Sequence, residues 1–266
     1  MTMGTTQILD SLPIVGVFVA FAIVSMLFYE GGFKFGRWYQ ERTPGEQEGP
    51  TNLLVGSILA LLAFLLAVTM GMASDRFDAR RGIVLDEANS IGTTFLRAGY
   101  LPEPASSQIR ELLREYVPLR VVVTDAKAAK VAVDIQRSQE LLDQIWTISE
   151  GVAKTTNQGD LVSVYLESLN ETIDLNETRI TAGLYARVPE TVLLLLIIGS
   201  ALSLAMVGYS AGLTKRRGLL NAVVLVIALG AVIMIVVDLD RPREGFIQVS
   251  QQPLIDLQRQ IGPPSS

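Results

Sequence analysis

Four stretches of the chain, each close to twenty residues long, contain no charged side chain. They occupy residues 11–29, 53–73, 191–212 and 218–237 of the 266-residue sequence. A helix needs about 20 mainly apolar residues to cross the hydrocarbon core of a bilayer. Charged residues make up 18% of the chain, against about 25% in a typical soluble domain. The sequence therefore predicts an all-α membrane protein with four transmembrane helices in the lipid bilayer.

The first apolar stretch resembles a secretory signal in length but lacks its other features. The segment Met1 to Asp10 has no Lys or Arg, and no small-residue cleavage site follows the apolar run. A removable signal normally has both. We therefore predict that this stretch remains in the protein as a membrane anchor.

Several residue types that carry enzyme chemistry are missing from the sequence. It contains no cysteine and no histidine, which excludes disulfides, thiolate or imidazole metal sites, and nucleophiles activated by histidine. The net charge of −5 gives no support to nucleic-acid binding, which normally shows a basic patch. We predict no enzyme activity, no cofactor and no nucleic-acid partner.

Charged residues, prolines and glycines flank the apolar stretches and divide the chain into eight predicted segments. The predicted segments are a first span (11–30), a short loop (31–51), a second span (52–74), an extramembrane helical domain (75–187), a third span (188–210), a short basic loop (211–218), a fourth span (219–237), and a juxtamembrane segment with the tail (238–266). Turn residues such as glycine and proline are the strongest local markers of such boundaries.

The middle domain is predicted to be a bundle of three long helices, two of them continuous with spans. No proline interrupts residues 51–101, so the second span is expected to continue as a helix well beyond the membrane. A second amphipathic helix covers about 104–154, and Pro118 should kink or divide it. The third helix is expected to run into the third span, with Pro189 at the membrane entry.

Heptad-like apolar seams on the second and third of these helices predict that they pack against each other. One seam consists of Leu141, Ile145, Ile148 and Val152; the other consists of Leu166, Leu169, Ile173, Asn176, Ile180 and Gly183. Asn176 is the polar member of the second seam. A single polar residue at such a position commonly fixes the register of the helices.

Basic residues in the two short loops indicate the orientation of the chain. The loops contain Lys34, Arg37, Arg42, Lys215, Arg216 and Arg217, whereas the first ten residues contain no basic residue. The positive-inside rule gives most weight to short loops, which places them in the cytoplasm and the middle domain and both termini outside. Five arginines near membrane ends on the other side argue against this orientation: Arg76, Arg80, Arg81, Arg179 and Arg187.

Charged residues gather where the second and fourth spans leave the membrane. The candidate cluster consists of Asp75, Arg76, Asp78, Arg80, Arg81, Glu87, Arg187, Asp238, Asp240, Arg241 and Arg243. Its structural interpretation is a collar of salt bridges that pins the helix ends together. Its functional interpretation is a vestibule that selects ions by rings of charge. A cation site at Asp238 and Asp240 is a third, weaker interpretation.

Within the spans, the polar residues carry only hydroxyl and amide groups. Proton-coupled carriers normally place ionisable groups in their spans, so this composition argues against a proton-driven transporter. A pore with an apolar constriction needs no such group, because dewetting can gate it. Small residues four apart, such as Gly199 with Ser203 and Ala201 with Ala205, suit close contact between helices.

Two motifs resemble the signature of the bestrophin-like domain family of bacterial membrane proteins. The first is DRFDARR at 75–81 with DEANSIGTT at 86–94 and Leu101-Pro; the second is DLDRPREGFIQVS at 238–250 with Pro253-Leu. The resemblance implies a distant relation to bestrophins, which are pentameric anion channels whose spans surround a cytosolic helical region. In bestrophins the helical region is thus cytosolic, whereas the loop charges of this chain favour an external middle domain.

Two functions remain open at this point. The first is an oligomeric, bestrophin-like ion channel or pore in the bacterial inner membrane, built from several copies of the chain. The second is a scaffold or sensor that conducts nothing and binds a protein partner through its helical domain. The heptad-like seams motivate the second function, and the resemblance motivates the first.

Overall fold

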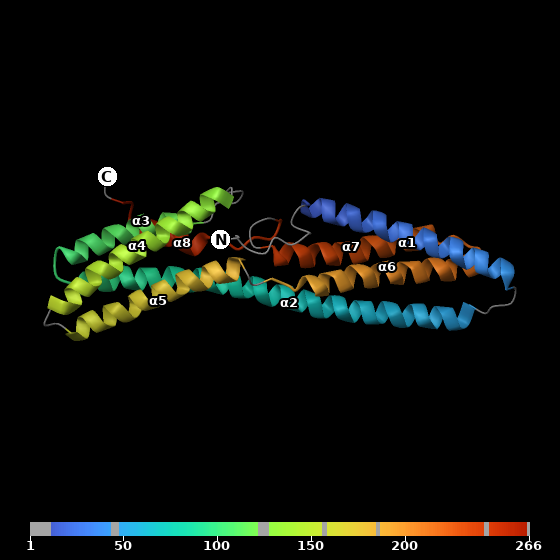
Figure 1. Ribbon diagram of the computed structural model, residues 1–266, viewed down its shortest axis with the longest axis horizontal. Helices are drawn as coiled ribbons and strands as arrows, with labels where there is room; N and C mark the ends of the chain where they lie inside the picture. Colours follow the sequence, from blue (N-terminus) through green and yellow to red (C-terminus); the bar gives the residue numbers. More distant parts are fainter. Residues whose placement is uncertain are drawn as a thin grey trace. The chain divides into compact units, whose positions relative to one another are not determined.

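The computed structural model describes residues 12–43, 48–121, 128–155, 159–184, 187–241 and 245–264. The helices in these ranges are α1 (Ile14–Arg42), α2 (Glu48–Arg97), the short 3₁₀ helix η2 (Ala98–Tyr100), α3 (Ala105–Arg120), α4 (Ala128–Thr155), α5 (Gly159–Leu184), α6 (Glu190–Leu213), α7 (Leu219–Asp240) and α8 (Gln252–Ile261) (Figure 1). The predicted all-α fold is confirmed. Helices α1, α2, α6 and α7 are long and apolar enough to cross a membrane, and the protein is a multi-pass membrane protein.

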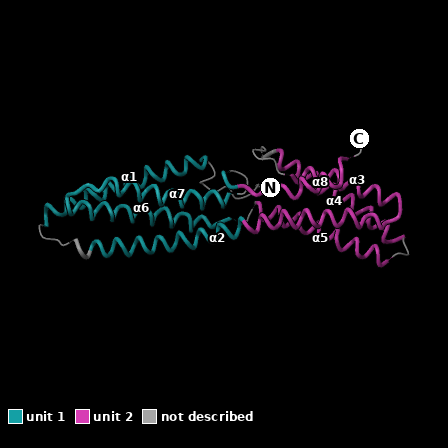
Figure 2. The backbone as a smooth tube through the Cα atoms, turned by 180° about the vertical axis from the view of Figure 1, so that it is seen from behind, with its two compact units in different colours: residues 1–77, 187–241, 245–247 teal, residues 78–186, 242–244, 248–266 magenta. Residues whose placement is uncertain are grey.

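The chain forms two compact units, which are coloured separately in Figure 2. Unit 1 contains residues 1–77, 187–241 and 245–247, and therefore α1, α6, α7 and the first part of α2. Unit 2 contains residues 78–186, 242–244 and 248–266, and therefore the rest of α2 with α3, α4, α5 and α8. Helix α2 belongs to both units, because it continues without a break to Arg97. Its predicted extension beyond the second span is confirmed.

The third helix of the middle domain does not run unbroken into the third span. Helix α5 ends at Leu184, and α6 begins at Glu190 with Pro189 as its N-cap. Proline disfavours helical backbone at the residue before it and carries no amide donor for a helical hydrogen bond. Pro189 therefore starts a new helix at the membrane entry instead of lying inside a continuous one.

The middle domain contains more helices than the three that the sequence predicts. The predicted helix over 104–154 is divided into α3 and α4, and α3 ends two residues after Pro118. The C-terminal segment adds α8, which buries Leu254, Leu257 and Ile261. These three residues recur at helical spacing, so one face of α8 is apolar and packs in unit 2.

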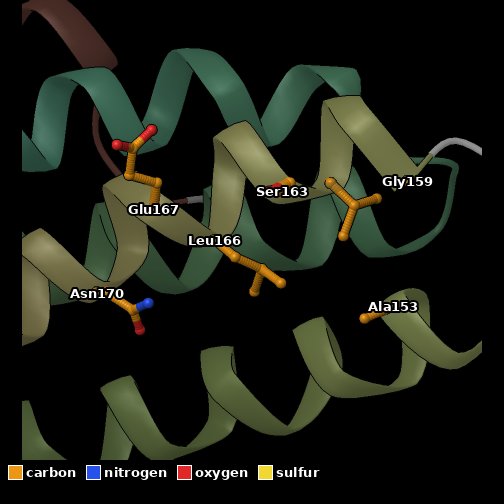
Figure 3. A pocket seen from close by; sticks show the side chains of 7 residues that line it. Ala153, Gly159, Ser163, Leu166, Glu167 and Asn170 are labelled. Carbon is orange, nitrogen blue, oxygen red and sulfur yellow. The ribbon is translucent and has the colours of Figure 1, made fainter.

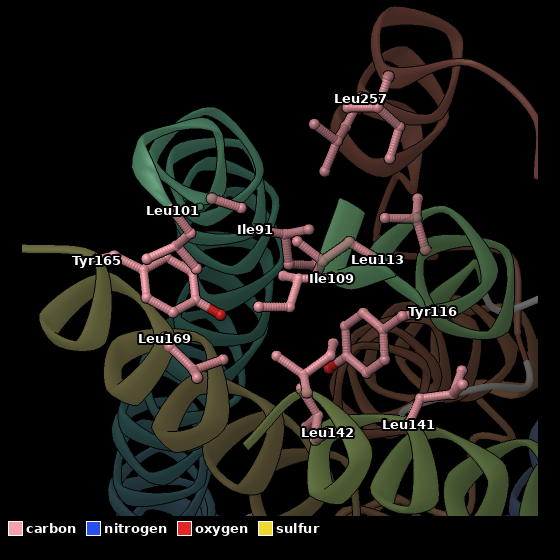
Figure 4. Packing of buried hydrophobic residues seen from close by; sticks show 14 of the residues in the cluster. Ile91, Leu101, Ile109, Leu113, Tyr116, Leu141, Leu142, Tyr165, Leu169 and Leu257 are labelled. Atoms are coloured by element: carbon pink, nitrogen blue, oxygen red, sulfur yellow. The ribbon is translucent and has the colours of Figure 1, made fainter. Parts of the chain in front are cut away.

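One apolar core holds unit 2 together (Figure 4). It joins Ile91 of α2, Ile109 and Leu113 of α3, Leu141 and Ile145 of α4, Tyr165 and Leu169 of α5, and Leu254 of α8. All of these side chains are fully buried. Asn176 lies in the predicted seam, is 1% exposed, and accepts a hydrogen bond of 3.2 Å from the Tyr116 hydroxyl. The side-chain oxygen of Asn176, the polar residue of the seam, therefore has a hydrogen-bond donor on α3.

Helices α1 and α6 of unit 1 cross in close contact, and each helix contributes glycines to the crossing. The glycines at this crossing are Gly32, Gly36, Gly208 and Gly212. A Cβ atom on Gly208 would overlap the backbone oxygen of Tyr29, and one on Gly36 would overlap that of Tyr209. Paired small residues at i and i+4 let two membrane helices approach at backbone distance. Only glycine fits these positions without separating α1 from α6.

Candidate functional site

Among the four candidate spans in the described ranges, the membrane part of α2 has the smallest buried fraction. Of its most apolar window, 17% is buried, against 28–39% in the other three spans. Its buried row includes Leu62, Leu66, Thr69 and Ala73. The remaining surface of this helix is open, and it divides into two rows of different character.

The first open row carries large apolar side chains. Its members are Leu53, Leu61, Phe64 and Val68, with exposed fractions between 46% and 74%. At 3.6 residues per turn this row lies opposite the buried row. Large apolar side chains suit contact with lipid tails, so this row has the character of a lipid-facing surface.

The second open row carries small side chains, and we call it the small-residue face. Its members are Gly56, Ala60, Ala63, Ala67, Gly71 and Ser74. All but the half-buried Ser74 are exposed. They recur every three or four positions and therefore share one side of the helix. A Cβ atom built on Gly56 or on Gly71 would meet nothing within 4 Å. Contacts with the described residues therefore do not explain the small size of these side chains.

Two acidic residues at the end of α7 bind protein donors within unit 1. Asp240 accepts a hydrogen bond of 2.6 Å from the Val188 amide and forms an ion pair of 3.2 Å with Arg187. Asp238 accepts hydrogen bonds of 2.9 Å each from the amides of Phe246 and Ile247. Asp238 is 3% exposed and Asp240 is 1% exposed. They hold the segments before α6 and after α7 against the end of α7.

Two arginines of unit 1 extend these contacts to further backbone carbonyls. Arg76 donates to the carbonyl of Arg187, and Arg241 donates to that of Leu12 at 2.8 Å. Gly245 has a φ of +135°, and a Cβ there would overlap the Asp238 carboxylate. No group of three metal-ligating side chains occurs within the described ranges. This geometry favours a structural role for the cluster in unit 1 over a cation site.

The remaining members of the predicted cluster are distributed differently. Asp75, Asp78 and Arg81 are exposed on α2, and Arg80 is 7% exposed. Arg243 lies outside the described residues. Glu87 belongs to unit 2 and is fully buried in its core. The described contacts of Asp238, Asp240, Arg76 and Arg241 are therefore made within unit 1, and those of Glu87 within unit 2.

Glu87 forms a buried network with two arginines. Its Oε1 accepts a hydrogen bond of 2.7 Å from Arg120 Nε, and its Oε2 accepts one from Arg179. Arg179 also donates to the Arg120 carbonyl at 2.9 Å and to Gln251 Oε1 at 2.7 Å. The network joins α2, α3, α5 and the residue that precedes α8. Arginine remains protonated in proteins, so one carboxylate faces two cations.

Tyr116 lies beside this network and couples it to the seam of α5. Burial raises the pKa of the Tyr116 phenol, and the neighbouring Arg120 cation lowers it less. The phenol is therefore protonated at neutral pH and donates to Asn176. The Arg120 guanidinium lies 5.8 Å from the centre of the Tyr116 ring. A buried phenol with a hydrogen-bond partner is the expected arrangement for tyrosine.

Sequence patterns alone do not identify Arg120, Arg179 or Gln251 as members of the network around Glu87. A signal for Arg120 exists in the spacing of α3, where Ile109, Leu113, Tyr116 and Arg120 follow one another at 4-3-4 positions. A charged residue in a buried row requires a buried partner of opposite charge. For Gln251 the sequence offers no comparable signal, because the position of the C-terminal segment depends on the tertiary fold.

An open groove of about 430 Å³ lies between α4 and α5 in unit 2 (Figure 3). It is lined by Ala153, Gly159, Val162, Ser163, Leu166, Glu167 and Asn170. Leu166 and Asn170 point toward α4, which carries Ala153 (Figure 3). Glu167 is the only ionisable residue among the described residues that line this groove, and they therefore lack the convergent charged groups of a catalytic site.

The chain resembles a protein family in sequence and several solved structures in fold. The model of the family described as Bestrophin-like domain matches residues 17–254 of the chain. The fold is similar to crystal structures of a bacterial bestrophin homolog from Klebsiella pneumoniae. One variant of that homolog has a TM-score of 0.67 at 12% identity and covers 91% of this chain and 97% of its own.

Two further structures of the Klebsiella pneumoniae homolog agree with the first. A structure solved by Zn-SAD phasing has a TM-score of 0.59 at 13% identity and covers 93% of this chain and 97% of its own. Another variant has a TM-score of 0.63 at 14% identity and covers 96% of both chains. At these identities the likeness shows the fold. No curated protein matches the sequence.

Proposed function

Because the chain belongs to the bestrophin-like domain family, we propose that it forms an oligomeric ion channel in which α2 of each subunit faces a central axis. The observation that carries this proposal is the small-residue face, which is exposed on the least covered span. One helix cannot enclose a passage, so several copies must contribute one α2 each. The relation to bestrophins favours an anion as the permeant ion.

The small-residue face fits an axial position better than a lipid-facing one. Small side chains in membrane helices occur where another backbone approaches closely or where space must remain open. The adjacent row, with Leu61, Phe64 and Val68, supplies the surface for lipid. The segment 53–73 contains no ionisable group. Conduction along this segment would therefore be controlled by pore width and wetting.

Larger side chains on the small-residue face are expected to reduce conduction. Ala63→Leu adds bulk from every subunit to the proposed axis, whereas Val68→Phe adds comparable bulk to the lipid-facing row. In proteoliposomes of purified protein we expect Ala63→Leu to lower chloride flux at least about fivefold, because an apolar constriction that narrows loses its water. Val68→Phe is expected to retain flux. If intact oligomers of the unmodified protein show no chloride flux, the proposal is contradicted.

A second candidate function is a membrane scaffold that binds a protein through unit 2. The groove between α4 and α5 favours this function, because it offers the partly buried Leu166 beside exposed Ser163 and Glu167. The two functions differ in one measurement. A scaffold conducts nothing in proteoliposomes, and substituting Leu166 with Glu would release its partner from native membranes.

We place the protein in a bacterial inner membrane with its short loops in the cytoplasm. The exposed basic residues of these loops support this orientation under the positive-inside rule. The middle domain and both termini would then be external. Reporter fusions after Tyr39 and within residues 155–160 would be active on opposite sides of the membrane, and would distinguish this orientation from the inverse one.

A further inference from the structure

The glycine crossing of unit 1 brings the two short-loop ends of the membrane helices together. A Cβ on Gly212 would overlap the carbonyl oxygen of Phe33 and lie 2.8 Å from the amide nitrogen of Arg37. The last turns of α1 are thus in backbone contact with the last turn of α6. Because α6 ends at Leu213, the turn that follows it lies close to the end of α1.

Six exposed basic residues gather at this place, and we call them the basic surface. They are Lys34, Arg37 and Arg42 at the end of α1, and Lys215, Arg216 and Arg217 in the turn before α7. Arg37 pairs with Glu41 at 3.2 Å, and Arg217 lies 3.6 Å from Glu30. Within the described ranges, Lys34, Lys215 and Arg216 form no ion pair. The basic surface therefore has a net positive charge directed at its surroundings.

Aromatic rings accompany the basic surface. Phe35 and Trp38 are 57% and 45% exposed, and their ring centres are 5.7 Å apart. Tyr209 of α6 continues this group at 5.8 Å from Phe35, and the Arg42 guanidinium lies 4.0 Å from the centre of the Trp38 ring. Aromatic side chains of this kind concentrate at the headgroup level of membranes.

The length of α1 is consistent with a position of the basic surface at the level of the lipid headgroups. Its 29 residues extend about 43 Å at 1.5 Å per residue, whereas the hydrocarbon core is about 30 Å thick. The helix is therefore about 13 Å longer than the core, and if it begins at one edge of the core, Lys34 and Arg42 lie at the level of the headgroups at the other edge. Leu219 and Leu220, which follow the basic turn, are 47% and 76% exposed and suit contact with acyl chains.

We propose that the basic surface binds the headgroups of anionic phospholipids. The phosphate of such a lipid would be held by Lys34, Lys215 and Arg216, while its acyl chains lie along the exposed apolar side chains of α1 and α7. Charge complementarity selects an anionic over a zwitterionic headgroup, since basic residues near a membrane surface attract anionic lipids. The adjoining apolar surface selects a lipid over a free phosphate ester. This proposal does not depend on whether the protein conducts ions.

Native mass spectrometry of the detergent-solubilised full-length protein tests the proposal. The probes are phosphatidylglycerol, phosphatidylcholine with the same acyl chains, and glycerol 3-phosphate. We expect phosphatidylglycerol to bind at least about tenfold more tightly than phosphatidylcholine, and glycerol 3-phosphate not to displace it. Equal binding of the two lipids, or displacement by glycerol 3-phosphate, would overturn the proposal.

A charge-matched pair of variants locates the binding. Lys34→Gln/Lys215→Gln/Arg216→Gln removes three charges from the basic surface, and Lys130→Gln/Lys154→Gln/Arg259→Gln removes three exposed charges from unit 2. The first variant should lose at least about tenfold in affinity for phosphatidylglycerol. The second should bind this lipid like the unmodified protein. Similar affinities for both variants would show that the basic surface is not the site.

Discussion

Glu87→Gln is expected to lower the free energy of unfolding of unit 2 by about 3–5 kcal/mol, because it leaves the buried Arg120 and the partly buried Arg179 without their carboxylate. Arg120 and Arg179 both donate to Glu87, which is fully buried. Glutamine retains one acceptor oxygen but no charge, so the two cations would repel each other in a medium that screens them poorly. The measurement is the thermal unfolding midpoint of the purified protein in detergent.

A neighbouring residue supplies the control for this substitution. Asp86→Asn makes the same change of charge one position away, on the exposed side of α2, and is expected to change stability by less than about 0.5 kcal/mol. In the double variant Glu87→Gln/Arg179→Gln the loss should be smaller than the sum of the single losses, because one unpaired cation has been removed. Additive losses would show that the network does not act as a unit.

Gly208→Ala is expected to destabilise unit 1 by about 3 kcal/mol or more, because its new Cβ overlaps the Tyr29 carbonyl and overpacking of this kind forces backbones apart. Neither side of the contact can yield by a side-chain rotation, since a helix backbone is the obstacle. Helices α1 and α6 must separate along the crossing. The expected readout is a lower temperature at which the detergent-solubilised protein loses its monodisperse elution profile.

The same substitution at a second glycine of α6 controls for the higher helix propensity of alanine. A Cβ on Gly199 would lie 3.5 Å from Leu62 Cδ1, an ordinary van der Waals contact. Alanine stabilises a helix by about 1 kcal/mol relative to glycine, so Gly199→Ala should be neutral or stabilising. Equal thermal stability of the Gly199 and Gly208 variants would mean that the crossing tolerates a methyl group and that α1 and α6 are held by other contacts.

The membrane helices could be predicted from the sequence because their signal is local. An uncharged stretch of twenty residues has few alternatives to a span, and the absence of proline from 51–101 was sufficient to predict the long helix α2. The division at Pro118 also followed from local chemistry. The break before Pro189 was not predicted, because an apolar seam on one side of it and a span on the other suggested a single helix.

The grouping of charged residues could not be predicted, because it depends on which helices meet. Glu87 is near Arg80 and Arg81 in sequence, yet its partners are Arg120 and Arg179 in unit 2. The glycine crossing was missed for the same reason. Gly32 and Gly208 are far apart along the chain, and a glycine four residues from another in one span gives no information about the helix that it will contact.

The most direct test of a channel lined by α2 uses the fact that the chain contains no cysteine. Ala63→Cys places a single thiol on the small-residue face, and Val68→Cys places one on the lipid-facing row of the same helix. Only a thiol in water ionises and reacts with a charged methanethiosulfonate reagent. The measurement is the current through purified protein in a planar bilayer before and after addition of this reagent. The proposed function predicts that the current changes in the Ala63→Cys protein and stays constant in the Val68→Cys protein. A current that the reagent leaves unchanged in the Ala63→Cys protein, or that it alters only in the Val68→Cys protein, would contradict a pore lined by the small-residue face of α2.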